Sequence, residues 1–317
     1  MLEEEKGILF TIIDTDAAID HLTSKNNYLR TASYRKNYRK HQSGENEGKY
    51  INLEFAYLAE LSKLDMCFRD IVLKMCIDIE HDLKVILLSE TEKLPEEDGY
   101  NIVNLFLKDN PQIVKSIESK IDTIFTGDLI NKYFKINTVI DFDNPEEFKY
   151  RIVDFDCPIW VLVELITFGD TIKLYEFFKQ LYPASSIINL SSNIMKPVKS
   201  LRNACAHNNC LLNSLEPSKA TQPPHIISQY VTNIHTIGKE ERMKKLSSRP
   251  LFEFTCMIYL YDKIVSQSVK LSRIPELEKI ICQRFYDCSE YYRSNQLIST
   301  SFSFLKKIVN NLVKNNK

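Results

Sequence analysis

The sequence predicts an all-α protein, a helical bundle built around one long core helix. Only 7 of its 317 residues are glycine, whereas sandwiches, barrels and glycine-rich nucleotide folds need many turns and positive-φ positions. Residues 52–90 contain neither glycine nor proline, and their apolar side chains recur at spacings of three and four. Hydrophobic residues make up 44% of the chain, which excludes a disordered protein.

The long helix is predicted over residues 52–90, after a short opening helix. Asn52 is a suitable N-cap, because its side chain can accept a hydrogen bond from a free backbone N–H of the first turn. Pro95 and Gly99 mark the end of the helical pattern. At 1.5 Å per residue such a helix reaches roughly 60 Å, well beyond the average globular helix. Its apolar stripe comprises Leu53, Tyr57, Leu61, Leu64, Phe68, Ile71, Met75, Ile79, Leu83 and Ile86.

Shorter helices follow, and proline or glycine marks their boundaries. They are predicted over 111–121, 171–182, 197–211, 252–269, 276–292 and 302–313. Two of them open on a proline, Pro111 and Pro197, whose missing N–H costs nothing in a first turn. Gly169 should end the apolar run 158–168. With no internal repeat and no long linker, one helical unit is the simplest architecture.

Residues 135–158 interrupt the helical pattern with β-type side chains and a group of carboxylates. These carboxylates are Asp141, Asp143, Glu146, Glu147, Asp154 and Asp156. A metal site is one interpretation, since carboxylate oxygens bind hard cations. Their spacing is loose and no histidine accompanies them, which favours a solvated acidic loop. No metal ion and no cofactor are therefore expected.

The chain as a whole carries almost no net charge, so it is not a polycationic protein. Lys plus Arg number 41 and Asp plus Glu 42, so the formal net charge is −1. Any nucleic-acid binding must therefore come from a local patch of cations. The few glycines form no Gly-x-Gly-x-x-Gly or Walker-type loop, which argues against the familiar nucleotide enzymes.

Cysteine usage and hydropathy point to the cytoplasm. No pair of the eight cysteines has the Cys-x-x-Cys spacing of a zinc or redox site. The acidic start lacks the basic-then-apolar order of a signal peptide. The longest apolar run, 157–168, is too short to cross a bilayer and contains Glu164. A cytoplasmic protein without membrane contact is expected.

The segment 201–208 contains the best candidate for catalysis, Arg202, Asn203 and His207. A metal-free ribonuclease needs a base for the ribose 2′-OH, an acid for the leaving 5′-oxygen and a cation for the charged phosphorane. Histidine suits either proton role, and arginine grips phosphate with a planar fork. On one helix Asn203 and His207 share a face, so Asn203 is expected to orient the imidazole. Asn208 is a weaker member of the group.

The spacing of arginine and histidine alone is a weak signal. With 11 Arg and 6 His in the chain, such a pair arises by chance about 0.6 times. A second pair exists, Arg35 and His41. Only Arg202 is followed directly by Asn and lies in an amphipathic, proline-started helix. The alternative for Arg202 and His207 is a helix-end pair bonded to neighbouring carboxylates.

A local excess of cations near the N-terminus is the second candidate site. Residues 25–40 contain no Asp or Glu, and tyrosines are interleaved with the cations. The expected RNA-binding residues are Lys25, Arg30, Tyr34, Arg35, Lys36, Tyr38, Arg39 and Lys40. Cations neutralise phosphates, and tyrosines stack on unpaired bases. The alternative is a solvated basic helix whose tyrosines pack on the core.

Four segments, in order, resemble the Abi-like (abortive infection) family of the HEPN superfamily, closest to its AbiF and AbiD types. Residues 201–212, LRNACAHNNCLL, resemble its Arg-Asn-x-x-Ala-His signature. Residues 64–88 resemble the family's long first core helix, with Arg69 and Glu80 as supporting residues. Residues 158–178 resemble its Trp/Glu/Phe-Gly segment, and residues 27–58 resemble the segment before the long helix.

The resemblance implies a fold and a function. It implies a basic segment at 1–50, a HEPN-like helical core with C-terminal helices at 51–317, and a role in phage defence. HEPN ribonucleases cut RNA without metal and leave a cyclic phosphate and a 5′-OH. Carried over by position, Arg202, Asn203 and His207 are the catalytic residues. With one convincing motif per chain, a paired site requires a homodimer, and some Abi-type members are restrained by a small structured RNA in a toxin–antitoxin arrangement. Glu80 is expected either to face the Arg202 helix or to form an interhelical ion pair.

Three functions are compatible with the sequence. The first is a metal-independent endoribonuclease toxin that binds RNA. The second is a non-catalytic RNA-binding protein on the same fold, in which Arg202 and His207 grip phosphate without cutting. The third is a helical protein-interaction sensor of a phage component.

Overall fold

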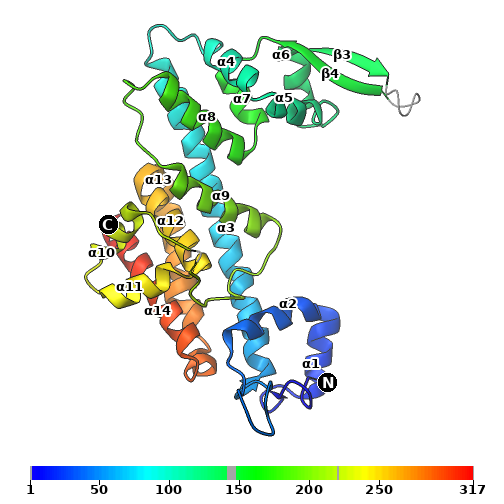
Figure 1. Ribbon diagram of the computed structural model, residues 1–317, viewed down its shortest axis with the longest axis vertical. Helices are drawn as coiled ribbons and strands as arrows, with labels where there is room; N and C mark the ends of the chain where they lie inside the picture. Colours follow the sequence, from blue (N-terminus) through cyan, green and yellow to red (C-terminus); the bar gives the residue numbers. More distant parts are fainter. Residues whose placement is uncertain (1, 141–147, 220, 317) are drawn as a thin grey trace. The chain divides into compact units, whose positions relative to one another are not determined.

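The computed structural model describes residues 2–140, 148–219 and 221–316 (Figure 1). The chain divides into two compact units, one formed by residues 1–79 with 193–317 and the other by residues 80–192. Helices dominate both, and the two small sheets have two strands each. The predicted all-α class is confirmed. Within the described residues, no helix is long and apolar enough to cross a membrane.

The predicted long helix is α3, Phe55–Glu92, which extends over 38 residues. It begins three residues later than Asn52, because Asn52 has a left-handed φ of 49° and starts no helix. The intervening strand β2, Leu53–Glu54, pairs in parallel with β1, Ile8–Leu9. Residues 55–79 of α3 belong to the first unit and the remainder to the second.

The first unit contains the first part of α3. Its other helices are α1 (Thr15–Asp20), α2 (Tyr28–Ser33), α9 (Ser192–Ala206), α10 (His225–Thr232), α11 (Lys239–Leu246), α12 (Arg249–Ile264), α13 (Gln267–Glu278) and α14 (Gln296–Asn315). The first part of α3 contacts α9, α12 and α13. The middle of α12, from Leu251 to Tyr261, is buried throughout. The helix predicted over 252–269 is interrupted, because Val265 and Ser266 are extended and separate α12 from α13.

The second unit contains five helices and a hairpin among its described residues. These are α4 (Asn101–Asp109), α5 (Pro111–Glu118), α6 (Gly127–Tyr133), β3 (Phe134–Ile140), β4 (Phe148–Phe155), α7 (Ile159–Leu165) and α8 (Phe168–Leu181). Strands β3 and β4 are antiparallel, which accounts for the β-type residues. The carboxylates Asp141, Asp143, Glu146 and Glu147 lie outside the described residues.

The break in the apolar run lies before Gly169, not at it. Ile166 and Thr167 are extended, and Thr167 caps α8 by accepting a hydrogen bond from the Asp170 N–H at 3.3 Å. Gly169 is therefore the second residue of α8. The Thr167 hydroxyl stabilises the start of α8 because it accepts a hydrogen bond from a backbone N–H that has no partner within the helix.

A buried lysine couples folding in the first unit to pH. The Lys245 ammonium of α11 donates to Thr300 Oγ1 (2.6 Å) and Ser301 Oγ (2.9 Å) of α14. Burial lowers the pKa of Lys245 to about 8. The folded state therefore disfavours the charged form, a penalty present in full below pH 8 and relieved as pH rises toward the unfolded pKa near 10.5.

We expect Lys245→Met to be at least as stable as the wild type at pH 7. Its advantage should shrink by about 2 kcal/mol between pH 8 and 10. Chemical denaturation of both proteins across this range measures the difference. The variant must be compared with the wild type at each pH, because burial also raises the pKa of the Cys256 thiol. Above pH 9 this thiol ionises in the unfolded state but not in the folded state, so both proteins lose stability there. Lys263→Met, which removes an exposed lysine of α12, should show no such trend; a pH-independent difference for Lys245→Met would contradict the assignment.

Candidate functional site

Helix α9 carries Arg202 and Asn203 at the edge of its buried face. The face that packs inward consists of Ile194, Met195, Val198, Leu201 and Cys205, a spacing of three and four that leaves Arg202 and Asn203 half-buried. The helix begins at Ser192 rather than at Pro197. Proline inside a helix removes one backbone hydrogen bond, and α9 tolerates that loss within its second turn.

The helix ends immediately before His207, not at Leu211. Asn208 has a left-handed φ of 57°. The Asn209 N–H donates to the Ala204 carbonyl at 2.8 Å, and the Asn208 N–H donates to the Cys205 carbonyl at 2.9 Å. This is the Schellman arrangement, with asparagine at the position that usually holds glycine. It presents His207 as an exposed turn residue and gives Asn208 a structural role.

Arg202 and Asn203 form a pair within the motif. The Arg202 guanidinium donates from Nη1 to Asn203 Oδ1 at 3.2 Å. Asn203 was expected to orient the imidazole, but the side-chain hydrogen bond seen here orients the guanidinium instead. His207 follows Arg202 by five residues, and α9 ends between them at Ala206. A phosphodiester shared by the guanidinium and the imidazole stays a prediction.

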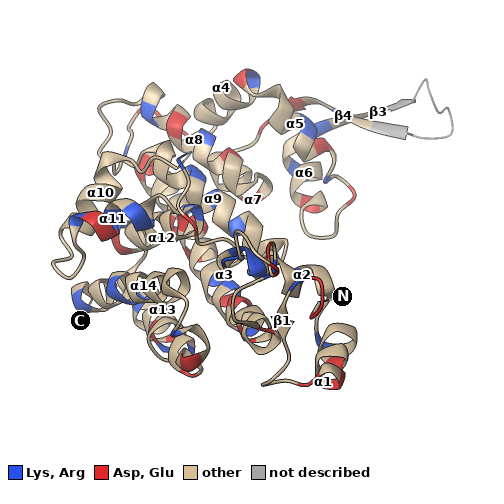
Figure 2. Cartoon of the chain, turned by 60° about the horizontal axis from the view of Figure 1, so that its bottom comes forward, with Lys and Arg blue, Asp and Glu red and all other residues tan. Residues whose placement is uncertain are grey.

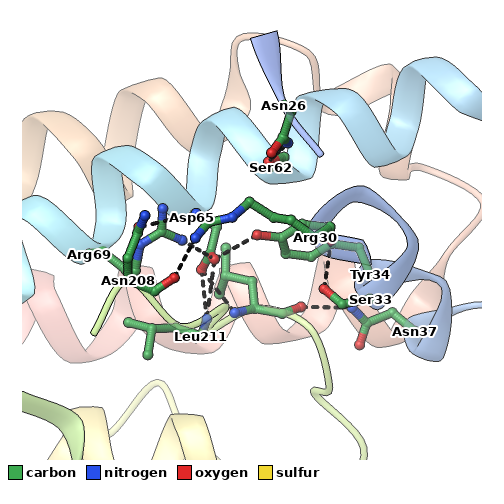
Figure 3. Close-up of polar contacts among 11 residues, drawn as sticks. Asn26, Arg30, Ser33, Tyr34, Asn37, Ser62, Asp65, Arg69, Asn208 and Leu211 are labelled. Atoms are coloured by element: carbon green, nitrogen blue, oxygen red, sulfur yellow. Dashed lines mark hydrogen bonds and ion pairs between the residues drawn. The ribbon is translucent and has the colours of Figure 1, made fainter. Parts of the chain in front are cut away.

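Asp65 of α3 binds the chain that follows the motif (Figure 3). Its carboxylate is fully buried; Oδ2 accepts from the Tyr34 hydroxyl at 2.7 Å and from Arg69 Nη1 at 2.5 Å. The backbone N–H groups of Leu211 and Leu212 donate to Oδ1 at 3.0 and 2.9 Å. Burial raises the pKa of Asp65, and the hydrogen bonds with Tyr34 and Arg69 oppose that effect. We call these five residues the Asp65 cluster.

Two further contacts join the basic segment to the end of α9. The Asn37 side chain donates to the Leu212 carbonyl at 2.8 Å and accepts from the Leu215 N–H at 2.9 Å. Arg30 donates from Nη1 to Asn208 Oδ1 at 3.1 Å and from Nη2 to the Asn208 carbonyl (Figure 3). The basic segment and the motif, more than 160 residues apart in sequence, thus lie side by side.

The tyrosines of the basic segment do not form the expected stacking platform. Tyr34 is fully buried and bonded to Asp65, so it presents no ring to a base. Residues 34–37 form a 3-10 turn and Tyr38 is extended, so the two tyrosines do not share a helix face. Tyr38 is half-buried, with its hydroxyl buried. The sequence did not predict that Tyr34 is buried, because the spacing of tyrosines along the chain is the same whether they face the core or the solvent.

The cations of the segment fall into two groups. Arg35 is half-buried, with its guanidinium 5.7 Å from the Tyr28 ring centroid and 6.0 Å from that of Tyr50. Lys25 is exposed and pairs with Asp20 at 2.6 Å. The remaining cations, Lys36, Arg39 and Lys40, are exposed, and we call them the basic triad. Lys40 Nζ lies 5.0 Å from the Tyr50 ring centroid. Exposed cations suit phosphate contacts better than buried ones.

The two supporting residues have different positions. Arg69 is buried and bonded to Asp65 one turn earlier on α3, so it contributes to the Asp65 cluster. Glu80 is half-buried on the part of α3 that belongs to the second unit. Its expected relation to the Arg202 helix stays a prediction.

Two lysines of α9 are further candidates for phosphate contacts that the sequence did not predict. Lys196 and Lys199 precede Arg202 at spacings of three, which makes successive cations neighbours on the helix surface. Lys196 is exposed and Lys199 half-buried, and the helix sequence contains no Asp or Glu. The three-residue spacing of these cations, in a helix without acidic residues, is the sequence pattern that indicates them. By contrast, α11 carries both signs of charge (Figure 2).

Comparison with known proteins agrees with the family resemblance. The family model described as Abi-like protein matches residues 21–213, more than half of the chain, and this range encloses the cations of residues 25–40, α3 and the motif. No curated protein and no solved structure matches. Within the described residues, no group of three or more His, Cys, Asp or Glu is placed to hold a metal ion. The chain belongs to the Abi-like protein family.

Proposed function

We propose that this protein acts in abortive infection as a metal-independent endoribonuclease of the HEPN type, with its site at Arg202, Asn203 and His207. Family membership supports the role in phage defence. The observation that carries the RNA assignment is the contact of Arg30 with Asn208, next to the exposed His207. Because Arg30 belongs to residues 25–40 and Asn208 directly follows His207, this contact supports one RNA-binding surface shared by the cations and the imidazole.

The chemistry follows from the properties of these side chains. The ribose 2′-oxygen attacks the adjacent phosphorus while the imidazole of His207 accepts the 2′-OH proton. Arg202 stabilises the negative charge that develops on the phosphoryl oxygens, and its bond to Asn203 holds the guanidinium in place. The P–O5′ bond breaks, and the 5′-oxygen takes a proton from water or from the histidine of a second protomer. The products are a 2′,3′-cyclic phosphate and a 5′-OH.

A non-catalytic RNA-binding protein is the second candidate. The observation in its favour is the Asn203 side chain, whose oxygen accepts from Arg202 rather than supporting the imidazole. In that case Arg202 and His207 hold the phosphate of a bound RNA without cutting it. In either case the proposed partner is RNA, in particular a small structured RNA that restrains the protein until infection.

The test measures both binding and cleavage by the full chain. RNA that co-purifies with the protein is sequenced, and a labelled single-stranded RNA is incubated with the protein in excess EDTA. We expect a discrete bound RNA and products that carry cyclic phosphate and 5′-OH ends. RNA binding without cleavage would favour the non-catalytic RNA-binding protein. If the protein neither binds nor cleaves RNA, the remaining function is the protein-interaction sensor.

Charge removal locates the binding surface. Replacing the basic triad by glutamine should lower RNA affinity and reduce the slope of log K against log salt by roughly two for a single strand. The matched control, Lys244→Gln with Lys263→Gln and Lys314→Gln, removes the same charge from exposed positions elsewhere in the first unit. Equal effects of the two triple variants would contradict a localised patch.

A further inference from the structure

A pocket of about 760 Å³ lies beside α9, away from the motif itself. Its volume falls within the range of small-ligand pockets, roughly 300–1,000 Å³. Helix α9 contributes Asn193, the residues just before α10 contribute Gln222 and Pro224, and α12 contributes Arg249, Phe252 and Glu253. Neither the proposed cleavage nor the basic triad uses this pocket.

Arg249 supplies a cation to the pocket wall. Its Nε donates to Glu253 Oε1 at 2.8 Å, and its Nη2 donates to Ser200 Oγ at 2.9 Å. These two bonds fix the plane of the guanidinium. Because a guanidinium has five N–H groups, three of them are left to bind an anion, and phosphate is the anion whose geometry the fork matches. The Arg249 side chain is 69% exposed, so a ligand can reach it.

The rest of the wall suits a flat ring with a polar edge. Pro224 and the small exposed edge of Phe252, 8% of that residue, provide apolar surface. The amide of Gln222 provides both a donor and an acceptor. The Glu253 carboxylate, 11% exposed, adds an acceptor next to the cation. An unstacked nucleotide needs an apolar contact for its base, polar groups for the edge of the base and a cation for its phosphate. The pocket wall contains all three.

The position of the pocket connects it with the motif. Ser200, which accepts from Arg249, precedes Arg202 by two residues on α9, a step of about 3 Å along the axis and about 200° around it. The pocket and Arg202 are therefore carried by the same helix on different faces.

We propose that this pocket binds one nucleotide unit, with its phosphate on Arg249 and its base against Pro224 and Gln222. The assignment to a strand near His207 rests on the proposed function. A free mononucleotide offers the same chemistry, and the experiment separates the two sources.

The first arm uses mononucleotides and does not depend on RNA binding. The full chain is titrated calorimetrically with AMP, GMP, CMP, UMP and inorganic phosphate at millimolar concentrations. At least one nucleotide should bind more tightly than phosphate, and Arg249→Gln should weaken it about tenfold or more. Gln222→Ala, in the exposed loop, should weaken it less and keeps the test valid if Arg249→Gln folds poorly. The control Lys263→Gln removes the same charge from the far end of α12, about 21 Å away, and should change nothing.

The second arm measures the RNA affinity and cut positions of the same variants. If Arg249→Gln and Gln222→Ala change either one, the nucleotide belongs to the strand; if only mononucleotide binding changes, the ligand is a free nucleotide. Phosphate binding as tight as any nucleotide, or no effect of either variant in both arms, would overturn the proposal. The basic triad variant still reports on RNA binding, so a failed pocket is distinguishable from a failed proposed function.

Discussion

Replacing His207 by alanine should abolish RNA cleavage while leaving RNA binding in place. A general base contributes about 10²–10⁴-fold to rate, so cleavage by His207→Ala is expected to fall by at least about 100-fold. Affinity should change by less than about twofold, because the cations of the basic segment supply most of it. His207 is exposed and lies outside the last helical turn, so the fold should tolerate the change. Initial rates and filter binding on one labelled RNA measure the two effects.

The second Arg–His pair of the sequence provides the matched control. His41 lies in the loop after the basic segment, where its backbone bonds with Lys49 and Gly48. His41→Ala should therefore keep full cleavage activity. If His41→Ala abolished cleavage and His207→Ala did not, the assignment of His207 as the catalytic base would be wrong. If His207→Ala lost RNA affinity and the wild type never cleaved, the protein would be a binding module.

Replacing Asp65 by alanine should destabilise the protein severely. The buried Arg69 guanidinium would lose its anion, and the Tyr34 hydroxyl and two backbone N–H groups would lose their acceptor. Removing one partner of a buried ion pair costs about 3–5 kcal/mol, a large share of the 5–15 kcal/mol typical of a domain. Urea unfolding monitored by circular dichroism measures the loss of free energy of unfolding.

An exposed ion pair on the same helix gives the control for this prediction. Asp70 pairs with Lys74 at the same i,i+4 spacing, but the Asp70 side chain is 67% exposed, whereas that of Asp65 is fully buried. Asp70→Ala should therefore cost less than about 1 kcal/mol. If Asp65→Ala does not fold, Tyr34→Phe removes only one hydroxyl group from the cluster and should cost about 1 kcal/mol. Equal losses for Asp65→Ala and Asp70→Ala would contradict the role of burial.

The same cluster explains how the two candidate sites come together. Asp65 is bonded to Tyr34 of the basic segment on one side and to Leu211 and Leu212 on the other. Loss of the cluster should therefore also loosen the turn that presents His207. A partly folded Asp65 variant is expected to lose cleavage activity before it loses secondary structure.

The elements with strong local signals were predictable from the sequence. The apolar period of α3 and the absence of glycine and proline from it predicted the long helix to within three residues at its start. Periodicity is local, so it survives any tertiary arrangement. Boundaries set by single turns were missed: Asn208 ends α9 through a left-handed backbone, and Thr167 rather than Gly169 sets the start of α8.

The motif, the excess of cations in residues 25–40 and the family resemblance are properties of the sequence by itself. Only the tertiary structure decided that Tyr34 faces the core, that Arg30 reaches Asn208, and that Asp65 is the acceptor between them. Asp65 is one polar residue in an amphipathic helix, and its partners lie 31 and 146 residues away in the chain. The free energy of a buried carboxylate depends on which donors surround it after folding, and no local pattern in the sequence records them.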